Sequence, residues 1–461
     1  MTIYIPEIEK TDEPLYKRLT NAIERDVKSG LLHPGTRLPT HREMADNIGM
    51  NVSTVTRAYR EAEKLGLVAG TVGRGTFVAS DASTVSSMRS TGPYQSEIIE
   101  LGIVGPLTDF DPDLSEYLAL FSRQKNLAAY MNYGDPGGME SHRTTGAEWM
   151  NRFGMATSPD NVLISAGGQH ALTCSFAGIF KPGQRIAAES LTYPGIKSLA
   201  GLLGLRLVPI AMDDEGMIPE SLEIACRRDD ISGVYLMPGV QNPTLACMSP
   251  KRREAVAEVI ARHGLTLIED DAYSPYRENQ PPPVSSLIPD NGVLIASVSK
   301  IFWAGMRVAF VAASKDKRNR IVGAVHNTMW MTPTLNAAFV ASVIENGAAD
   351  RVLAAKKAEL ARRLEYALKI FNGVSIRTIP YGSYIWVSLP ESWNGLALES
   401  IAREHKVNVF SAEKFSVGNS QPPKAVRLSL TGENDFSRLA RGLEIVSGII
   451  SSPEPVMRPV M

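Results

Sequence analysis

The sequence predicts a chain of two parts, a small and mainly helical N-terminal domain and a large α/β domain with a mostly parallel sheet. After residue 160, seven short apolar runs alternate with helical stretches, which is typical of a parallel sheet covered by helices on both faces. The runs are 162–165, 186–188, 207–210, 234–236, 265–268, 294–296 and 308–311. Before residue 80, apolar positions recur with helical spacing. A stretch rich in serine and threonine separates the two patterns. We therefore expect domains at 1–80 and 98–461, joined by a linker over 81–97.

The composition excludes several classes of protein. Of the 461 residues, 44% are hydrophobic, which is enough for a sizeable core. The net charge is -1, so a nucleic acid would have to be bound by a local basic patch. The chain shows neither a secretory signal nor an apolar run near the roughly 20 residues that span a bilayer. Three scattered cysteines lack metal spacing. We expect a cytoplasmic protein without a metal site or a membrane partner.

The first eighty residues predict three helices and a hairpin. Thr40 and Glu43 have the spacing of a capping box, which sets the start of the second helix. The expected elements are a helix over 15–31, a helix over 41–49, a helix over 52–65 and two short strands around a glycine-rich turn within 66–78. This order is that of a winged helix-turn-helix, in which the third helix enters the major groove of DNA.

The third helix is expected to turn Val55, Ala58, Tyr59 and Ala62 into the core. Its polar face carries the residues expected to meet DNA. They are Ser53, Thr54, Thr56, Arg57 and Arg60. Residues 14–80 hold ten Lys and Arg against six Asp and Glu, a modest basic excess. A three-helix module that docks another protein is the alternative, but the short turn and the wing occurring together favour DNA.

Four segments of this domain resemble the GntR-type DNA-binding domain. They are Pro14-Leu15-Tyr16, residues 34–42, residues 53–59 and residues 73–78. The resemblance implies that Arg42 and the start of the third helix contact double-stranded operator DNA, and that Arg74 and Gly75 of the wing reach the minor groove. Many relatives carry arginine where this chain has Val52, so base readout there is expected to differ.

A lysine stands at the end of an apolar strand late in the chain. Ser297-Val298-Ser299-Lys300 follows the apolar run 293–296, and Arg307 comes seven residues after the lysine. Desolvation would lower the pKa of Lys300 and free its amine to attack an aldehyde. The two serines and Arg307 could hold a phosphate. An aldehyde and a phosphate on one small molecule describe pyridoxal 5′-phosphate (PLP), although a lone lysine would more often be a solvated one.

Further polar residues follow other predicted strands, where ligands bind in parallel sheets. Asp270 could pair with the protonated pyridine nitrogen of PLP, and it is preferred to Asp271 because Tyr273 lies three residues beyond it. Asn242 and Tyr273 could bind the ring oxygen, and Tyr193 could stack on the ring. The alternatives are a capping or metal-binding role for Asp270 and plain loop packing for Tyr193.

Two more features could bind anions. Gly168 and Gln169 open a helix whose N-terminus could hold the phosphate, although an ordinary strand–helix turn would look the same. Arg427 lies in an apolar strand, where an arginine needs an anion. The α-carboxylate of an amino acid would serve, and a structural ion pair is the alternative.

These motifs occur in the order found in fold-type I aminotransferases, which the chain resembles from about residue 98 to 450. The resemblance implies that Lys300 is the catalytic lysine that forms the internal aldimine. It implies a cofactor site made of Lys300, Asp270, Tyr273, Asn242, Tyr193, Gly168, Gln169, Ser297, Ser299 and Arg307, with Arg427 for the substrate carboxylate. Tyr133-Gly134-Asp135-Pro136 also matches, and implies that Tyr133 reaches the phosphate held by the partner subunit.

The whole chain, from the winged helix to the late arginine, resembles the MocR/GabR regulators. The resemblance implies a homodimer, and a head-to-tail arrangement of its two subunits is one of the arrangements it allows. We expect a PLP-dependent transcriptional regulator that senses an amino acid or amine by aldimine exchange at Lys300, with at most weak transaminase activity. The alternative is a working aminotransferase with an appended DNA-binding domain. A DNA-binding protein whose large domain only dimerises is disfavoured by the complete cofactor set.

Overall fold

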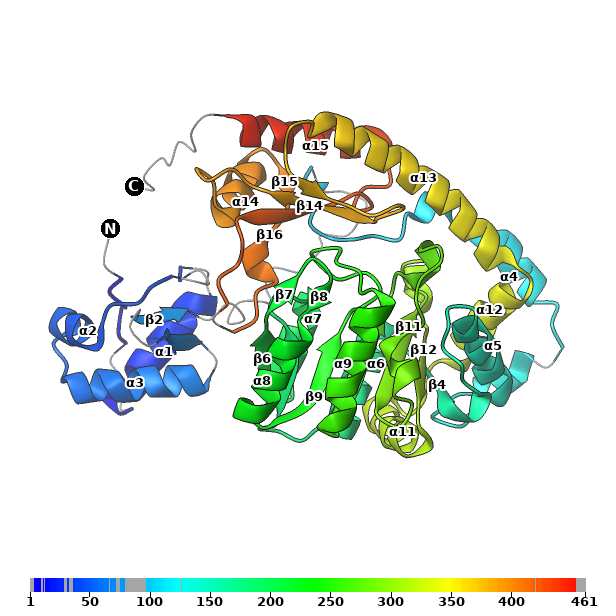
Figure 1. Cartoon of the computed structure of the whole chain (residues 1–461), viewed down its shortest axis with the longest axis horizontal. Coiled ribbons are helices and arrows are strands. Elements are labelled where there is room, and N and C mark those ends of the chain that lie inside the picture. Colours follow the sequence, from blue (N-terminus) through cyan, green and yellow to red (C-terminus); the bar gives the residue numbers. More distant parts are fainter. Residues whose placement is uncertain are drawn as a thin grey trace.

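A computed structural model gives the arrangement of most of the chain (Figure 1). It describes residues 4–9, 11, 13–28, 31–32, 36–65, 67–71, 75–78, 97–125, 127–418 and 420–452. Except for Glu97, the predicted linker lies outside these residues, so its boundaries stay a prediction. Within the described ranges, no helix is both long and apolar enough to cross a membrane.

The N-terminal domain has the predicted order of elements. They are α1 (Leu15–Lys28), α2 (His41–Ile48), α3 (Val52–Lys64), β1 (Val68–Thr71) and β2 (Gly75–Val78). The capping box is formed, because Thr40 Oγ1 accepts from the Glu43 N–H at 3.3 Å and Glu43 Oε2 accepts from the Thr40 N–H at 2.8 Å. Gly49 adopts the left-handed conformation that ends α2.

The core of this domain confirms the inward positions of α3 and corrects the end of α1. Val55, Ala58, Tyr59 and Ala62 are all buried, as their spacing predicted. The helix expected over 15–31 was wrong at its end, since α1 stops at Lys28. The Leu32 N–H donates to the Asp26 carbonyl, and Leu32 is buried whereas Leu31 is 70% exposed.

All seven predicted apolar runs are strands of one sheet in the large domain. The strands are β4 (Val162–Ser165), β5 (Arg185–Glu189), β6 (Arg206–Ile210), β9 (Ile231–Leu236), β10 (Thr266–Asp271), β11 (Gly292–Ser297) and β12 (Ala309–Ala313), in the spatial order β4-β12-β11-β10-β9-β5-β6. Only β12 runs antiparallel to its neighbours within this sheet. The prediction of a mostly parallel sheet is confirmed.

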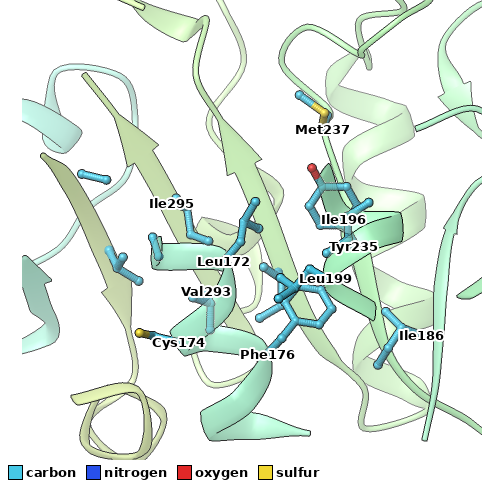
Figure 2. Packing of buried hydrophobic residues seen from close by; sticks show 14 of the residues in the cluster. Leu172, Cys174, Phe176, Ile186, Ile196, Leu199, Tyr235, Met237, Val293 and Ile295 are labelled. Carbon is cyan, nitrogen blue, oxygen red and sulfur yellow. The ribbon is translucent and has the colours of Figure 1, made fainter. Parts of the chain in front are cut away.

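Helices cover both faces of this sheet (Figure 1). They are α5 (Glu140–Asn151), α6 (Gly168–Ile179), α7 (Pro194–Leu202), α8 (Pro219–Asp229), α9 (Pro250–Arg262), α10 (Val284–Leu287), α11 (Lys315–Met329) and α12 (Thr334–Glu345). Neighbouring residues of β11 belong to opposite cores, because Val293 and Ile295 pack with α6, α7 and α11 while Leu294 packs with α5 and α12. Figure 2 shows Leu172 and Phe176 of α6 in the first of these cores.

A second, smaller layer lies beside the large sheet (Figure 1). Its antiparallel sheet has the order β13-β14-β17-β16 and packs with the long helix α13 and with α14 and α15. The bounds are β13 (Ile376–Arg377), β14 (Tyr384–Ser388), β16 (Phe410–Ser411), β17 (Ala425–Ser429), α13 (Ala348–Ile370), α14 (Gly395–Glu404) and α15 (Phe436–Ser451). The predicted strand with Arg427 is therefore β17, in this second sheet.

Short elements complete the fold. They are β3 (Ile99–Glu100), which pairs in parallel with β15 (Val407–Asn408), the hairpin of β7 (Met212–Asp213) and β8 (Gly216–Met217), and α4 (Leu114–Phe121). The pairing of β3 with β15 attaches the start of the large domain to the smaller layer.

Candidate functional site

A cavity of about 280 Å³ lies at the carboxyl ends of the central strands, where the smaller layer approaches the large sheet. The structure brings together almost the whole predicted site around it. The predicted residues that line the cavity are Gly168, Gln169, Tyr193, Asn242, Asp270, Tyr273, Ser297, Ser299, Lys300, Arg307 and Arg427. Segments separated by more than two hundred residues thus meet at one site.

Lys300 follows β11 and reaches into this cavity. Its Nζ donates to the Val104 carbonyl at 2.6 Å, and its own carbonyl accepts from the Tyr276 hydroxyl at 2.7 Å. Burial, helped by the positive charges of Arg427 and Arg307, lowers the pKa of Lys300 to about 8, with Asp270 acting in the opposite direction. A larger fraction of the amine is therefore uncharged near neutral pH than in an ordinary lysine, which favours its action as a nucleophile.

Asp270 lies within β10, which extends through Asp271 and is thus longer than the predicted run. Its Oδ2 accepts a hydrogen bond from the Tyr235 hydroxyl at 2.8 Å. Burial raises the pKa of Asp270 to about 6, and the neighbouring charge of Asp271 adds to the effect. Asp271 instead accepts from the backbone N–H groups of Tyr273 and Ser274. Of the two carboxylates, only that of Asp270 lines the cavity.

The part of the cavity lining around the start of α6 is suited to a dianion. Helix α6 begins at Gly168, directly after Gly167 in a left-handed conformation with φ of 85°. A Cβ at Gly167 would lie 2.4 Å from Arg307 Nη2, so glycine lets the guanidinium approach this helix end. Arg307 Nη1 also donates to Ser299 Oγ at 3.3 Å. Helix N–H groups, a guanidinium and hydroxyls therefore converge, as phosphate binding requires.

Arg427 is buried at the other side of the cavity, with 4% of its surface exposed. Its Nη1 donates to Asn242 Oδ1 at 2.6 Å, its Nη2 donates to the Gly102 carbonyl, and its Nε has no hydrogen-bond partner in the described part of the chain. The guanidinium lies 4.8 Å from the ring centre of Phe415. No ion pair found among the described residues includes Arg427, so the alternative of a structural ion pair has no support here, and the role toward a carboxylate stays a prediction.

Sequence reasoning missed the segment that crosses the cavity, residues 102–104, which we name the pocket strap. The Gly102 carbonyl accepts from Arg427, the Val104 carbonyl accepts from Lys300, and Ile103 between them lines the cavity. Glu100 Oε1 holds the strap by accepting from the N–H groups of Gly102 and Ile103 at 2.7 and 2.8 Å. No local motif signals this segment, because its place depends on the pairing of β3 with β15.

The residues present fit PLP. The α6 end of the cavity suits its phosphate, and Asp270 suits its protonated ring nitrogen. Asn242 uses its oxygen for Arg427, which leaves its amide nitrogen as a donor for the ring oxygen. The Tyr193 hydroxyl donates to Gln169 Oε1 at 3.1 Å, which fixes the tyrosine at the cavity wall. When bound, PLP supplies an aldehyde that captures amines and a ring that withdraws electrons.

The predicted DNA-binding residues lie on the surface of the N-terminal domain. Arg42, Ser53 and Arg57 are exposed, whereas Thr54 and Thr56 are half-buried. Arg57 lies over the Tyr16 ring, 3.9 Å from its centre, so its guanidinium is already oriented. Gly75 begins strand β2, and Arg74 lies outside the described residues. These positions match a recognition helix whose polar face is free to enter a groove.

Comparison with known proteins decides the family. The family model for bacterial regulatory proteins of the gntR family matches residues 15–78, and that for aminotransferase class I and II matches residues 110–443. The HTH-type transcriptional regulator YdeF of Bacillus subtilis is 34% identical over 96% of both chains. The chain belongs to the MocR-type regulators. It is thus a PLP-dependent transcriptional regulator with a GntR-type domain and a fold-type I aminotransferase-like domain.

Other proteins resemble this MocR-type regulator. The vitamin B6 salvage pathway transcriptional repressor PtsJ of Salmonella typhimurium is 26% identical over 90% of this chain and 94% of its own. The crystal structure of LysN, an α-aminoadipate aminotransferase of Thermus thermophilus, has a TM-score of 0.69 and 25% identity over 77% of this chain and 92% of its own. Regulators match the whole chain, whereas this aminotransferase matches mainly the large domain.

Tyr133 is the one predicted cofactor residue that the structure does not bring to the cavity of its own chain. Its side chain is 84% exposed, and its ring centre lies 5.6 Å from that of Trp330. The implied contact is with the phosphate in the partner subunit, so the role of Tyr133 stays a prediction.

Proposed function

We propose that this MocR-type regulator senses an amino acid or amine at the cavity and transmits its presence to operator DNA. The observation that carries the proposal is that Lys300 and Arg427 line one cavity. Lys300 is the amine that would hold PLP covalently and yield that place to an effector amine. Arg427 would hold the effector carboxylate. The winged helix in the same chain provides the output.

The cofactor roles follow from the positions described above. Lys300 would hold the PLP aldehyde, Asp270 the ring nitrogen, and Asn242 and Tyr273 the ring oxygen. Tyr193 would cover the ring face. The phosphate would be held by Gly168, Gln169, Ser297, Ser299 and Arg307.

We also infer a homodimer, because the large domain exposes several large apolar side chains on or next to elements that contact one another. The exposed side chains are Leu118, Leu120, Met131, Tyr133 and Trp330, which come from α4 and the segments next to α5 and α12. An apolar surface of this kind marks an interface. Burial of Tyr133 against a second copy would place it near the partner's cavity. The head-to-tail arrangement of the DNA-binding domains and a cytoplasmic location belong to the same proposal.

A working aminotransferase is the second candidate, because the same residues could serve turnover. The 2-aminoadipate transaminase of Thermus thermophilus is 28% identical over 63% of this chain. One PLP-loaded preparation, assayed for amino-acid turnover and for operator affinity, separates the two. We expect an amino compound to change operator affinity at concentrations where turnover is slow. Fast turnover with an unchanged operator affinity would favour the enzyme.

Arg42→Ala and Arg57→Ala are expected to weaken operator binding, because both exposed arginines lie where a winged helix meets its groove. Each lost phosphate contact should also reduce the slope of log affinity against log salt concentration by about one unit. A lost base contact should weaken the free energy of binding by about 1–3 kcal/mol. The measurement is gel shift on a fragment selected by the wild type from random DNA, at several salt concentrations. Lys17→Ala, an exposed charge on α1, is the control. Unchanged affinity of both folded arginine variants would contradict the assignment.

A further inference from the structure

We propose that the effector is an α-amino acid with one carboxylate and an uncharged, apolar side chain. This inference rests on the proposed function, because it assumes that an amino compound occupies the cavity. It concerns the wall that the effector side chain would meet. The pocket strap forms that wall, and its composition decides which side chains are accepted.

The strap joins the two groups that would anchor the effector. Its first carbonyl, from Gly102, accepts from Arg427, and its last, from Val104, accepts from Lys300. A ligand whose carboxylate takes Arg427 and whose amine takes the place of the Lys300 amine must therefore lie along the strap. Ile103, between these two carbonyls, lines the cavity. Phe410 lines it beside Arg427, 5.5 Å from its guanidinium.

The cavity offers no spare charge for a charged effector side chain. Among the described residues that line it, the charged ones are Asp270, Lys300, Arg307 and Arg427, and each has a role toward PLP or the α-carboxylate. The remaining wall is largely apolar. Its apolar members are Ile103, Val104, Leu172, Pro194, Met237, Ala272 and Phe410. A second carboxylate or an ammonium group would be desolvated here without a partner, which disfavours acidic and basic amino acids.

Glu100 is the acid next to the strap, and its carboxylate is already occupied. It accepts from the N–H groups of Gly102 and Ile103, and from Asn408 Nδ2 at 2.8 and 2.9 Å. Releasing these bonds to bind an effector ammonium would free the strap itself. Glu100 is thus a positioning residue for the wall and is a poor partner for a basic side chain.

Four matched compounds test the proposal on full-length, PLP-loaded protein. L-Norvaline has the apolar side chain, L-glutamate has a carboxylate at the same chain length, L-ornithine has an ammonium group, and butylamine is norvaline without its carboxylate. We expect norvaline to change the visible spectrum and the operator affinity at a concentration at least about tenfold below the other three. Equal or better action of glutamate or ornithine would overturn the apolar wall.

A gain of function at the wall gives a second, independent measurement. Ile103→Arg should let glutamate act at least about tenfold more strongly than on the wild type, because it supplies a partner for the second carboxylate. Ile103→Leu is the matched control and should keep the preference for norvaline. Retention of the PLP band and of operator binding shows that each variant is folded. If the Ile103→Arg protein is folded but gains no response to glutamate, the inference that the strap contacts the effector side chain is wrong.

The outcomes also separate this inference from the function on which it rests. If no amino compound of the series changes either readout, the proposed sensing function fails, and the inference fails with it. If glutamate or ornithine acts best, sensing stands and the apolar wall is wrong. If butylamine acts as well as norvaline, the carboxylate anchor is wrong.

Discussion

Lys300→Ala is expected to abolish the covalent attachment of PLP. The wild type, reconstituted with PLP, should be yellow, with a visible absorption band that borohydride removes. The reason is that Lys300 combines a lowered pKa with a place in the cavity that Asp270 and Arg307 also line. Absorption spectra before and after borohydride, followed by mass measurement of the labelled peptide, check the result.

Lys197→Ala is the matched control for this experiment. Lys197 is also buried, on α7 and four residues after Tyr193, but its Nζ donates to the Lys414 carbonyl at 3.0 Å. The control should keep the band. A borohydride-reducible PLP adduct in Lys300→Ala would show that another lysine binds the aldehyde.

The same reaction has a predictable pH dependence. Only the uncharged amine attacks an aldehyde, and burial near Arg427 and Arg307 lowers the pKa of Lys300 to about 8. The rate at which the PLP-free protein captures PLP should therefore rise with pH and level off above about 8, and it should fall at lower pH as the amine becomes protonated. A rate that still rises above pH 10, near the ordinary pKa of lysine, would contradict the desolvated amine.

The sequence was sufficient for the elements whose signals are local. The capping box located the start of α2, and the apolar runs located every strand of the large sheet, because both depend on neighbouring residues. The end of α1 was wrong, since Leu31 continues the four-residue spacing of the helix although Leu32 is the leucine that is buried. Local sequence patterns identify an element, but tertiary packing decides where its last turn ends.

The site was predictable where a residue follows a strand and unpredictable where a contact is long-range. Asp270 and Lys300 follow or end strands, so they could be found by position. The strap could not be found, because Glu100 and Gly102 take their places from pairing with residues three hundred positions later. Tyr235 was missed for a related reason, since its hydroxyl reaches Asp270 across neighbouring strands. A hydrogen bond between side chains on neighbouring strands depends on how the two strands are aligned, and the sequence of one strand does not show that alignment.

Arg427→Ala is expected to keep PLP and operator binding but to lose the response to the effector. Arg427 has a free Nε and no acid partner among the described residues, so it can receive a carboxylate. Removing one partner of a buried charge pair costs about 2–5 kcal/mol, so at least about thirtyfold more effector should be needed. The measurement is operator affinity during titration with the amino acids that change the visible spectrum.

The response to the effector depends on Arg427 because the same guanidinium also contacts the pocket strap. A carboxylate that binds Arg427 competes for the donors that now reach Gly102 and Asn242, so effector binding and strap position are linked. The ligand shifts that equilibrium only by its differential affinity for the two states. Because the strap follows β3, which comes directly after the predicted linker in the chain, we expect its shift to be a route to the DNA-binding domain. Arg427→Lys keeps the positive charge but loses the paired N–H donors of the guanidinium, so this variant should respond only weakly to the effector. A normal response of Arg427→Ala would make Arg427 a structural residue and would remove this route.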